Sequence, residues 1–230
     1  MSAIASTQEY IIDLEKNEGD WLLEAGCGSL SRINLPEGFR IAGIDISEKQ
    51  LNRNASIEKK ICGDIQTFEL EKNKFKLCIC WDVLEHLKSP EKALNNLMNS
   101  LEIGGTIILA MPNIRSLKGL ITKFSPHWFH IFYYKKILGI ANAGKDDTAP
   151  FETFLNEITS PDSVKKILES QGFSIKKLIF RDAMVYRLKI SHKSLWCFYY
   201  IASNVLSTLT GGKYGGMNNS DYIIIATKDK

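Results

Sequence analysis

The sequence predicts an α/β fold, in which helices cover both faces of a mostly parallel sheet. Three observations predict it. Short apolar runs in the first half stop at Gly, Asp or Pro, as buried parallel strands do; helical patterns separate these runs; and this alternation breaks after Pro112. With 230 residues, 44% of them apolar, the chain can bury a full core, and we expect a single domain over 1–230.

Seven segments are expected to form the strands. A polar, helix-like stretch over residues 1–20 precedes them and does not resemble a secretory signal. Cys78 and Cys80 alternate along one apolar run, so they share a face of that strand and are expected as small core residues rather than metal ligands. The seven runs are WLLEA from residue 21, RIAGID from 40, KKICGD from 59, FKLCICW from 75, TIILAMP from 106, SIKKLIF over 174–180 and DYIIIAT over 221–227.

Two helices carry signals at both ends. Each begins with a serine that can cap the helix and a proline at the first helical position, and glycine follows the end of the first helix and stops the second. These residues are Ser89, Pro90 and Gly104 with Gly105 for the first helix, and Ser160, Pro161 and Gly172 for the second.

Two irregular segments interrupt the pattern. Residues 113–159 contain many aromatic and basic residues without a clear strand and are expected to be an inserted substrate lid. Residues 183–220 form a second insertion between the last two strands. It contains the apolar run 195–210, which is shorter than the roughly 20 residues a membrane-spanning helix needs. This run is expected to be a buried or interfacial helix.

Charge gives a limited indication of partners. The net charge of +3 is small beside 29 basic and 26 acidic residues, so it gives no support for a nucleic-acid partner. Basic residues flank aromatic ones in the lid and over 187–210, which suits peripheral contact with an anionic membrane. An ordinary helix packed on the sheet is the alternative. We expect a cytoplasmic protein, with or without this contact. The basic residues are Arg115, Lys118, Lys123, Lys135, Lys136, Arg187, Lys189 and Lys193.

Polar residues and glycines follow the predicted strands at one edge of the sheet, where ligands of open α/β folds bind. Asp45 lies 19 residues after Gly26 and is placed to accept the hydroxyls of a ribose. Its alternative role, a helix cap, suits Ser47 better. Asp64 either accepts the amine of an adenine or simply ends a strand. A dinucleotide fingerprint would need a third glycine, but Ser31 stands at that position.

Several motifs resemble the class I S-adenosylmethionine-dependent methyltransferases, in particular the ubiquinone-type branch (methyltransferase type 11/23-like). They are LLEAGCGS, IAGIDIS, GDI, FKLCICWDVLEHLKSPEKALNNL and LEIGGTIILAMPN, in this order. The resemblance covers residues 20–113 well, and the later helix-strand unit SPDSVKKILESQGF also fits. It implies a Rossmann-like sheet of seven strands with the last strand antiparallel.

The resemblance also implies S-adenosyl-L-methionine as cofactor, without a metal. The loop after the first strand would pass under the methionine part, Asp45 would hold the ribose, and the remaining residues would contact the adenine or line the pocket. The chain departs from the family at Leu30, which replaces a third glycine, and at Lys76, which replaces an acidic residue. The implied cofactor residues are Glu24, Ala25, Gly26, Cys27, Gly28, Asp45, Ile46, Asp64, Ile65 and Trp81.

The expected reaction is in-line methyl transfer to a small-molecule or lipid-linked acceptor, with O-methylation favoured by the branch resembled. A hydroxyl acceptor needs a base, and the candidates are His127 and His130 in the lid and His86 after the fourth strand. For His86 an orienting hydrogen bond within its own turn is the alternative. A non-catalytic cofactor-binding or scaffold protein of the same fold stays open; a nicotinamide-dependent oxidoreductase is disfavoured by the missing fingerprint.

Overall fold

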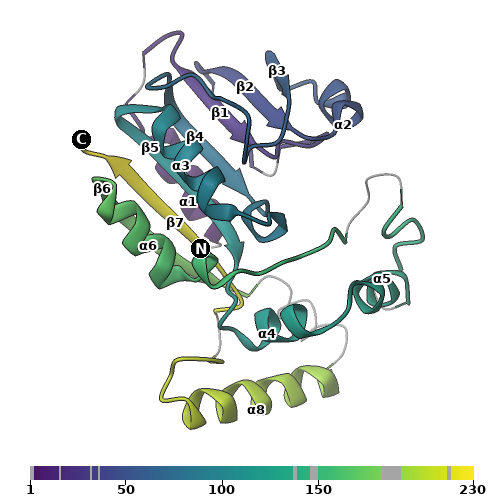
Figure 1. Ribbon diagram of the computed structural model, residues 1–230. Coiled ribbons are helices and arrows are strands. Elements are labelled where there is room, and N and C mark those ends of the chain that lie inside the picture. Colours follow the sequence, from purple (N-terminus) through teal and green to yellow (C-terminus); the bar gives the residue numbers. More distant parts are fainter. Residues whose placement is uncertain are drawn as a thin grey trace.

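A seven-stranded sheet forms the centre of the computed structural model, which describes residues 3–15, 17–31, 33–35, 37–136, 139–145, 150–182, 193–216 and 219–230 (Figure 1). The strand order is β3-β2-β1-β4-β5-β7-β6. Strand β7 runs antiparallel to both of its neighbours, and the other pairs are parallel. The predicted strands and fold class are therefore confirmed. The strands are β1 (Trp21–Ala25), β2 (Arg40–Asp45), β3 (Lys59–Cys62), β4 (Phe75–Trp81), β5 (Leu101–Pro112), β6 (Phe173–Arg181) and β7 (Asp221–Lys228).

Helices cover both faces of this sheet. On one face, α3 (Pro90–Ser100) and α6 (Pro161–Ser170) pack over a core that includes Cys78 and Cys80, as predicted for these cysteines. On the other face, α1 (Ala3–Ile12) places Ile11 in a second core cluster. Both cores form because successive strand residues point to opposite faces, as Leu22 and Leu23 do.

The two Ser-Pro helix starts differ. Ser160 caps α6 as predicted, because its hydroxyl accepts a hydrogen bond from the Ser163 N–H, and Gly172 ends the helix unit with φ +80°. Ser89 stands at the cap position of α3, but its side chain makes no capping hydrogen bond. Its N–H donates instead to Oε1 of Gln66, at 2.9 Å. The predicted capping role of Ser89 is therefore wrong.

The connection from β1 to β2 contains no helix in residues 29–31, 33–35 and 37–39, although the alternating pattern predicts one. Pro36 lies near the middle of this connection of fourteen residues, where its missing N–H and fixed φ interrupt a helix, and Gly38 follows it with a φ of +85°. The hydroxyl of Ser31 also donates to the Glu24 carboxylate, which holds the start of this connection near β1. Leu30 is 76% exposed. The helix α2 (Glu48–Arg53) follows β2 instead.

A helical lobe lies beyond the carboxyl ends of the parallel strands (Figure 1). It consists of α4 (Leu117–Phe124) and α5 (His127–Lys136) from the predicted lid, and α8 (Lys193–Leu209) from the second insertion. Helix α8 packs against α4, but Ser203 is its only fully buried residue, so the prediction of a buried helix is wrong and the interfacial alternative stays open. Within the described residues, no helix has the length and hydropathy to span a membrane.

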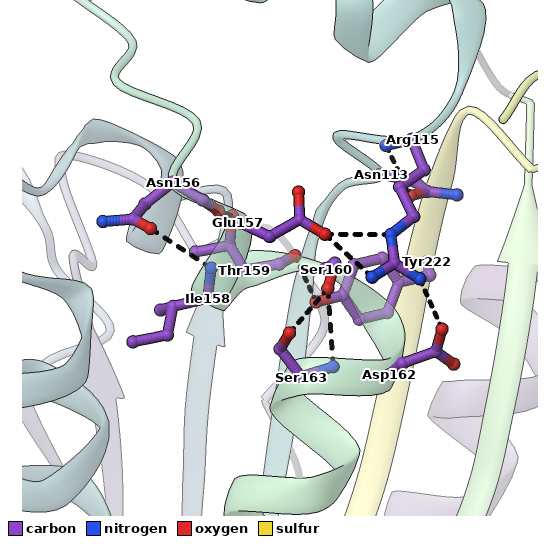
Figure 2. Close-up of polar contacts among 10 residues, drawn as sticks. All are labelled: Asn113, Arg115, Asn156, Glu157, Ile158, Thr159, Ser160, Asp162, Ser163 and Tyr222. Carbon is purple, nitrogen blue, oxygen red and sulfur yellow. Dashed lines mark hydrogen bonds and ion pairs between the residues drawn. The ribbon is translucent and has the colours of Figure 1, made fainter. Parts of the chain in front are cut away.

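The predicted lid is fixed at its base by Arg115 (Figure 2). The Arg115 guanidinium donates to Glu157 at 2.8 and 3.0 Å, and to Asp162 at 2.5 Å. Glu157 begins the short helix η2 (Glu157–Thr159), and Asp162 lies in the first turn of α6. The Tyr222 hydroxyl of β7 donates to the Thr159 carbonyl at 2.8 Å. Both ends of the lid are thus tied to each other and to the sheet.

Candidate functional site

The turn after β1 requires glycine at two positions. Gly26 and Gly28 have φ values of +68° and +52°, which favour glycine. A Cβ added at Gly26 would lie 2.2 Å from Cγ2 of Val83, and one at Gly28 would lie 2.9 Å from Oε1 of Gln50. The turn is therefore packed tightly between the segment after β4 and the helix α2.

Asp45 connects this turn to the end of β2. Its Oδ2 accepts a hydrogen bond from the Gly28 N–H at 2.8 Å, and its Oδ1 accepts one from the Ser47 N–H at 2.9 Å. The hydroxyl of Ser47 accepts from the Gln50 N–H and caps α2, as predicted. Because a carboxylate offers about four acceptor positions, Asp45 keeps capacity for further hydroxyl donors.

The other side of the turn combines an exposed apolar residue with a second carboxylate. Ile46 is 77% exposed, next to Asp45. Asp64 accepts from the Gln66 N–H at 2.8 Å and from the Gln66 amide group at 3.0 Å. Ile65, which the resemblance places at the adenine, is only 5% exposed and packs in the core. Its carbonyl oxygen accepts a hydrogen bond from Nδ2 of Asn96 at 2.9 Å, so Ile65 has a structural role here.

The other residues implied for the cofactor are buried beneath the turn. Glu24 and Ala25 are inaccessible, and Cys27 packs against Leu51 and Ile57. Burial raises the pKa of the Cys27 thiol to about 12, so this side chain is an inert part of the core. Trp81 is also a core residue, with the Arg181 guanidinium 5.0 Å from its ring centroid. These side chains support the turn from below.

A second polar cluster lies beyond the carboxyl ends of β4 and β5, beside the end of β6 and the start of β7. The sequence predicts His86 as a site residue of this region, but not the charged residues around it. Asp82 has a φ of +54° and lies 3.9 Å from Arg181. Lys118 in α4 pairs with Asp221 at the start of β7, at 2.5 Å. Lys118, Arg181 and Asp221 were not predicted as site residues, because they come from segments far apart in the chain and no short motif links them.

Glu85 is the buried acid of this cluster. It is 3% exposed, and its Oε2 has no hydrogen-bond partner among the described residues. Burial raises the pKa of Glu85 well above its ordinary value, and the negative charge of Asp82 adds to this effect. Both effects favour the protonated form of Glu85, whose hydroxyl can donate a hydrogen bond.

Glu85→Gln is expected to stabilise the fold at alkaline pH. Since the pKa of Glu85 is raised in the folded state, its contribution to stability is fully present below the unfolded value of about 4.5 and is lost as pH rises through the folded value. The neutral amide removes that loss. In thermal unfolding, the Tm of the variant should gain a few degrees on the wild type as the pH rises above about 5, where the unfolded carboxyl is ionised. Glu69→Gln, at an exposed position, is the control; an identical pH dependence in both variants would contradict the prediction.

His86 lies beside Glu85 in the short helix η1 (Leu84–His86). Its Nδ1 is 2.7 Å from the Glu152 carbonyl oxygen, and because a carbonyl only accepts, Nδ1 carries the proton. The lone pair is then on Nε2, which is 3.9 Å from Oε1 of Glu85. Burial lowers the pKa of His86, an effect opposed by the Glu152 hydrogen bond and by Asp82. The orienting hydrogen bond exists, but its partner lies in the lid and not, as predicted, in the turn itself.

The two lid histidines have different positions. His127 begins α5, close enough to His86 for its charge to lower the pKa of that residue further. His130 is turned toward the end of α4, with Nε2 at 3.0 Å from Oγ and 3.3 Å from the carbonyl oxygen of Ser125. The structure thus brings His86 and His127 together and gives His130 a role in fixing α4.

Comparison with known proteins supports the methyltransferase class that the sequence motifs resemble. Residues 23–109 match the model of a family described as methyltransferase domain. The uncharacterized protein MJ0638 of Methanocaldococcus jannaschii is 37% identical over 103 residues, which cover 44% of this chain and 45% of that protein. A ubiquinone biosynthesis O-methyltransferase of Coxiella burnetii is 22% identical over 152 residues, 62% of each chain. This chain therefore spans about half to three fifths of the curated relatives it matches.

Solved structures share the fold along nearly the whole chain. A SAM-dependent methyltransferase from Archaeoglobus fulgidus has a TM-score of 0.56 at 19% identity, and the match covers 98% of this chain and 92% of that one. Haemonchus contortus phosphoethanolamine N-methyltransferase 2, in complex with S-adenosyl-L-methionine, has a TM-score of 0.56 at 14% identity over 99% of this chain and 52% of the other.

The sheet order, the glycine turn and the acidic strand ends define a Rossmann-like protein with a site for an adenosine-containing cofactor. Residues 23–109 match the methyltransferase domain family. This match and the shared fold support a class I methyltransferase with S-adenosyl-L-methionine as cofactor.

The residues at the turn fit this cofactor. Gly26 and Gly28 give the turn its left-handed backbone and its close packing on Val83, Asp45 offers acceptors to ribose hydroxyls, and exposed Ile46 offers an apolar surface to an adenine. The individual contacts stay predictions.

Proposed function

We propose that this protein transfers the methyl group of S-adenosyl-L-methionine to a hydroxyl of a small-molecule or lipid-linked acceptor. The observation that carries the proposal is that two half-sites, one for the cofactor and one for the acceptor, lie along the same edge of the sheet. The turn with Asp45 follows β1 and β2, while the polar cluster with Glu85 and His86 follows the neighbouring β4. The named activity of the Coxiella burnetii relative, an O-methyltransferase, supports oxygen as the acceptor atom.

The cofactor, when bound, supplies a methyl group attached to a positively charged sulfur, and this sulfur is the leaving group when an acceptor atom bonds to the methyl carbon in line. The protein contributes alignment and a base. The lone pair on Nε2 of His86 accepts the acceptor's hydroxyl proton, and the Glu152 carbonyl keeps the imidazole in the required tautomer. The Glu85 carboxyl, whose raised pKa favours the protonated form, lies with Oε1 3.9 Å from Nε2 of His86.

The segment after the lid helices keeps water from this half-site. The Phe154 N–H donates to the Glu85 carbonyl at 2.8 Å, and the Phe151 ring meets the His86 imidazole edge-on, with 5.8 Å between centroids. Leu155, fully buried with a φ of +42°, turns the chain back toward η2. This segment therefore covers η1 and limits solvent access to His86.

Binding and turnover test the proposal separately. Calorimetric titration of the full chain with S-adenosyl-L-methionine should give saturable heat, and a nicotinamide dinucleotide should give none. Incubation with cell extract and the cofactor should then add one methyl group to a metabolite, detected by mass spectrometry. Absence of cofactor binding would overturn the proposal.

His86→Gln is expected to lower kcat by about 100-fold near neutral pH, because a positioned base contributes on this scale, while the Kd for the cofactor stays unchanged. The wild-type rate should rise with pH through the pKa of His86, which lies below its ordinary value of 6.5, and the variant should lose this rise. Methyl transfer to the acceptor found in extract measures both effects. His130→Gln, at the α4 end, should keep the pH profile; an unchanged profile in His86→Gln would exclude His86 as the base.

A non-catalytic protein of the same fold is the second candidate. It is supported by Leu30, which is exposed where the resemblance has a third glycine, and by the lack of a helix among the described residues 29–31, 33–35 and 37–39 after the turn. Cofactor binding in the calorimeter without methylation of any extract component would favour this candidate. Such a protein would also tolerate His86→Gln without any functional change.

The cytoplasm is the compartment we propose for this reaction. All five cysteines are free thiols, and Cys62 and Cys197 are exposed. Exposed free thiols suit a reducing compartment, where they do not pair. Contact with the membrane surface is argued below.

A further inference from the structure

The basic residues of this chain are segregated in two segments. Residues 113–145 and 183–220 together contain ten Lys and Arg and no Asp or Glu. The rest of the chain contains 19 Lys and Arg and 26 Asp and Glu, so the small net charge of +3 hides +10 in these segments and −7 elsewhere. The described parts of both segments supply the helical lobe, apart from the sheet (Figure 1).

Helix α8 in this lobe exposes an apolar face. The side chains on this face follow a helical spacing of three or four residues, which places them in one narrow stripe. The helix contains no acidic residue. Its opposite side faces the lobe, where the Ser203 hydroxyl donates to the Gly216 carbonyl at 2.8 Å. The exposed residues are Leu195 (55%), Phe198 (75%), Ile201 (61%), Val205 (51%) and Leu209 (79%).

Lysines flank this face and its neighbour α4. Lys193 begins α8, Lys213 follows its end, and both are exposed. In α4, exposed Lys123 lies with its Nζ 6.0 Å from the ring centroid of Phe124, which is itself 78% exposed. Basic side chains beside exposed apolar ones suit a surface that is anionic at its boundary and apolar just below it.

We propose that the α8 face docks in the plane of an anionic lipid bilayer. The apolar stripe would enter the boundary between headgroups and acyl chains, where burial of its apolar area stabilises the docked state. The flanking lysines add attraction to the anionic headgroups. A nucleic acid offers no apolar partner for the stripe, and the lack of acidic residues disfavours a basic protein partner.

The docked lobe would hold the carboxyl edge of the sheet near the membrane, since the lobe lies beyond that edge (Figure 1). A lipid-linked acceptor could then reach His86 without leaving the bilayer. This statement about the acceptor rests on the proposed function, whereas the docking itself does not. Residues 187–192, which the sequence also places in the contact, lie outside the described residues.

Vesicle flotation of the full chain tests the docking. At low salt the protein should float with vesicles of phosphatidylglycerol and phosphatidylcholine, but not with phosphatidylcholine alone. The double variant Phe198→Ser/Leu209→Ser should lose at least about 10-fold in partitioning, and Lys193→Glu/Lys213→Glu should lose a similar amount in a salt-dependent way. Ile103→Ser is the matched control: Ile103 is 69% exposed but lies in β5, near the amino end of the strand, and its loss should change nothing.

Two results would overturn the docking proposal. One is the absence of flotation with anionic vesicles; the other is full flotation of the Phe198→Ser/Leu209→Ser variant. Light scattering of the wild type provides a further check, because a dimer that the same double variant dissociates would assign the face to a second copy. Far-ultraviolet circular dichroism confirms that each variant is folded. Cofactor titration of the same samples separates the two proposals, because a chain that floats without binding S-adenosyl-L-methionine contradicts only the proposed function.

Discussion

Asp45→Ala should weaken the binding of S-adenosyl-L-methionine by about 100-fold. The carboxylate is placed to accept hydrogen bonds from two ribose hydroxyls, and hydrogen bonds to charged groups contribute about 1.5–3 kcal/mol each. The substitution also releases the N–H groups of Gly28 and Ser47, which Asp45 holds at 2.8 and 2.9 Å, so the turn loses its fixed shape. Isothermal titration calorimetry measures the change in Kd directly.

Asp20→Ala is a matched control for this prediction. Asp20 also accepts a hydrogen bond from a backbone N–H, that of Asn17 at 2.8 Å, but it precedes β1 at the opposite end of the strand. Its removal should leave the Kd unchanged. A Kd for Asp45→Ala within about threefold of the wild type would show that the ribose does not bind there.

Gly26→Ala should destabilise the fold by about 3–5 kcal/mol. The φ of +68° is unfavourable for alanine, and the new Cβ would lie 2.2 Å from Cγ2 of Val83, so overpacking adds to the backbone cost. For a chain of this length the loss corresponds to a fall in Tm on the order of 10 °C. Urea unfolding followed by circular dichroism measures the free energy.

Gly104→Ala separates the backbone cost of a positive φ from the cost of the contact with Val83. Gly104 has a φ of +79°, but a Cβ there would have nothing within 4 Å, so only the backbone cost of about 1 kcal/mol is expected. Val83→Ala should rescue part of the Gly26→Ala loss, because it removes both γ carbons that the new methyl meets. Equal losses for Gly26→Ala and Gly104→Ala would show that the contact with Val83 is not rigid.

The turn and its acidic partners were predictable because each follows a strand within a few residues. Asp45 ends β2 and Asp64 follows β3, so the parallel sheet alone brings them to the same edge. The lack of a helix in the described part of the β1–β2 connection was harder to predict, because the alternation of apolar runs does not show which connections contain a helix. Ser89 was misread because its N–H finds Gln66, a partner that only the folded chain brings near.

The polar cluster beside His86 was not predictable for a different reason. Lys118 and Asp221 are 103 residues apart, and they meet because β7 pairs antiparallel with β5 in a register that sets Pro112 opposite Asp221. No local motif encodes that register. The tautomer of His86 likewise depends on the Glu152 carbonyl, 66 residues away.

The position of β7 between β5 and β6 has a consequence for how the chain is made. Thr106 pairs with Thr227, so β5 has one unpaired edge until the last strand leaves the ribosome. Strand β6 is also without a neighbour during that time, because β7 is its only partner in the sheet. Unpaired strand edges favour association between chains. Newly made chains are therefore most vulnerable to aggregation just before residues 221–228 emerge, and those eight residues cover the open edge of β5 and one edge of β6 in one step.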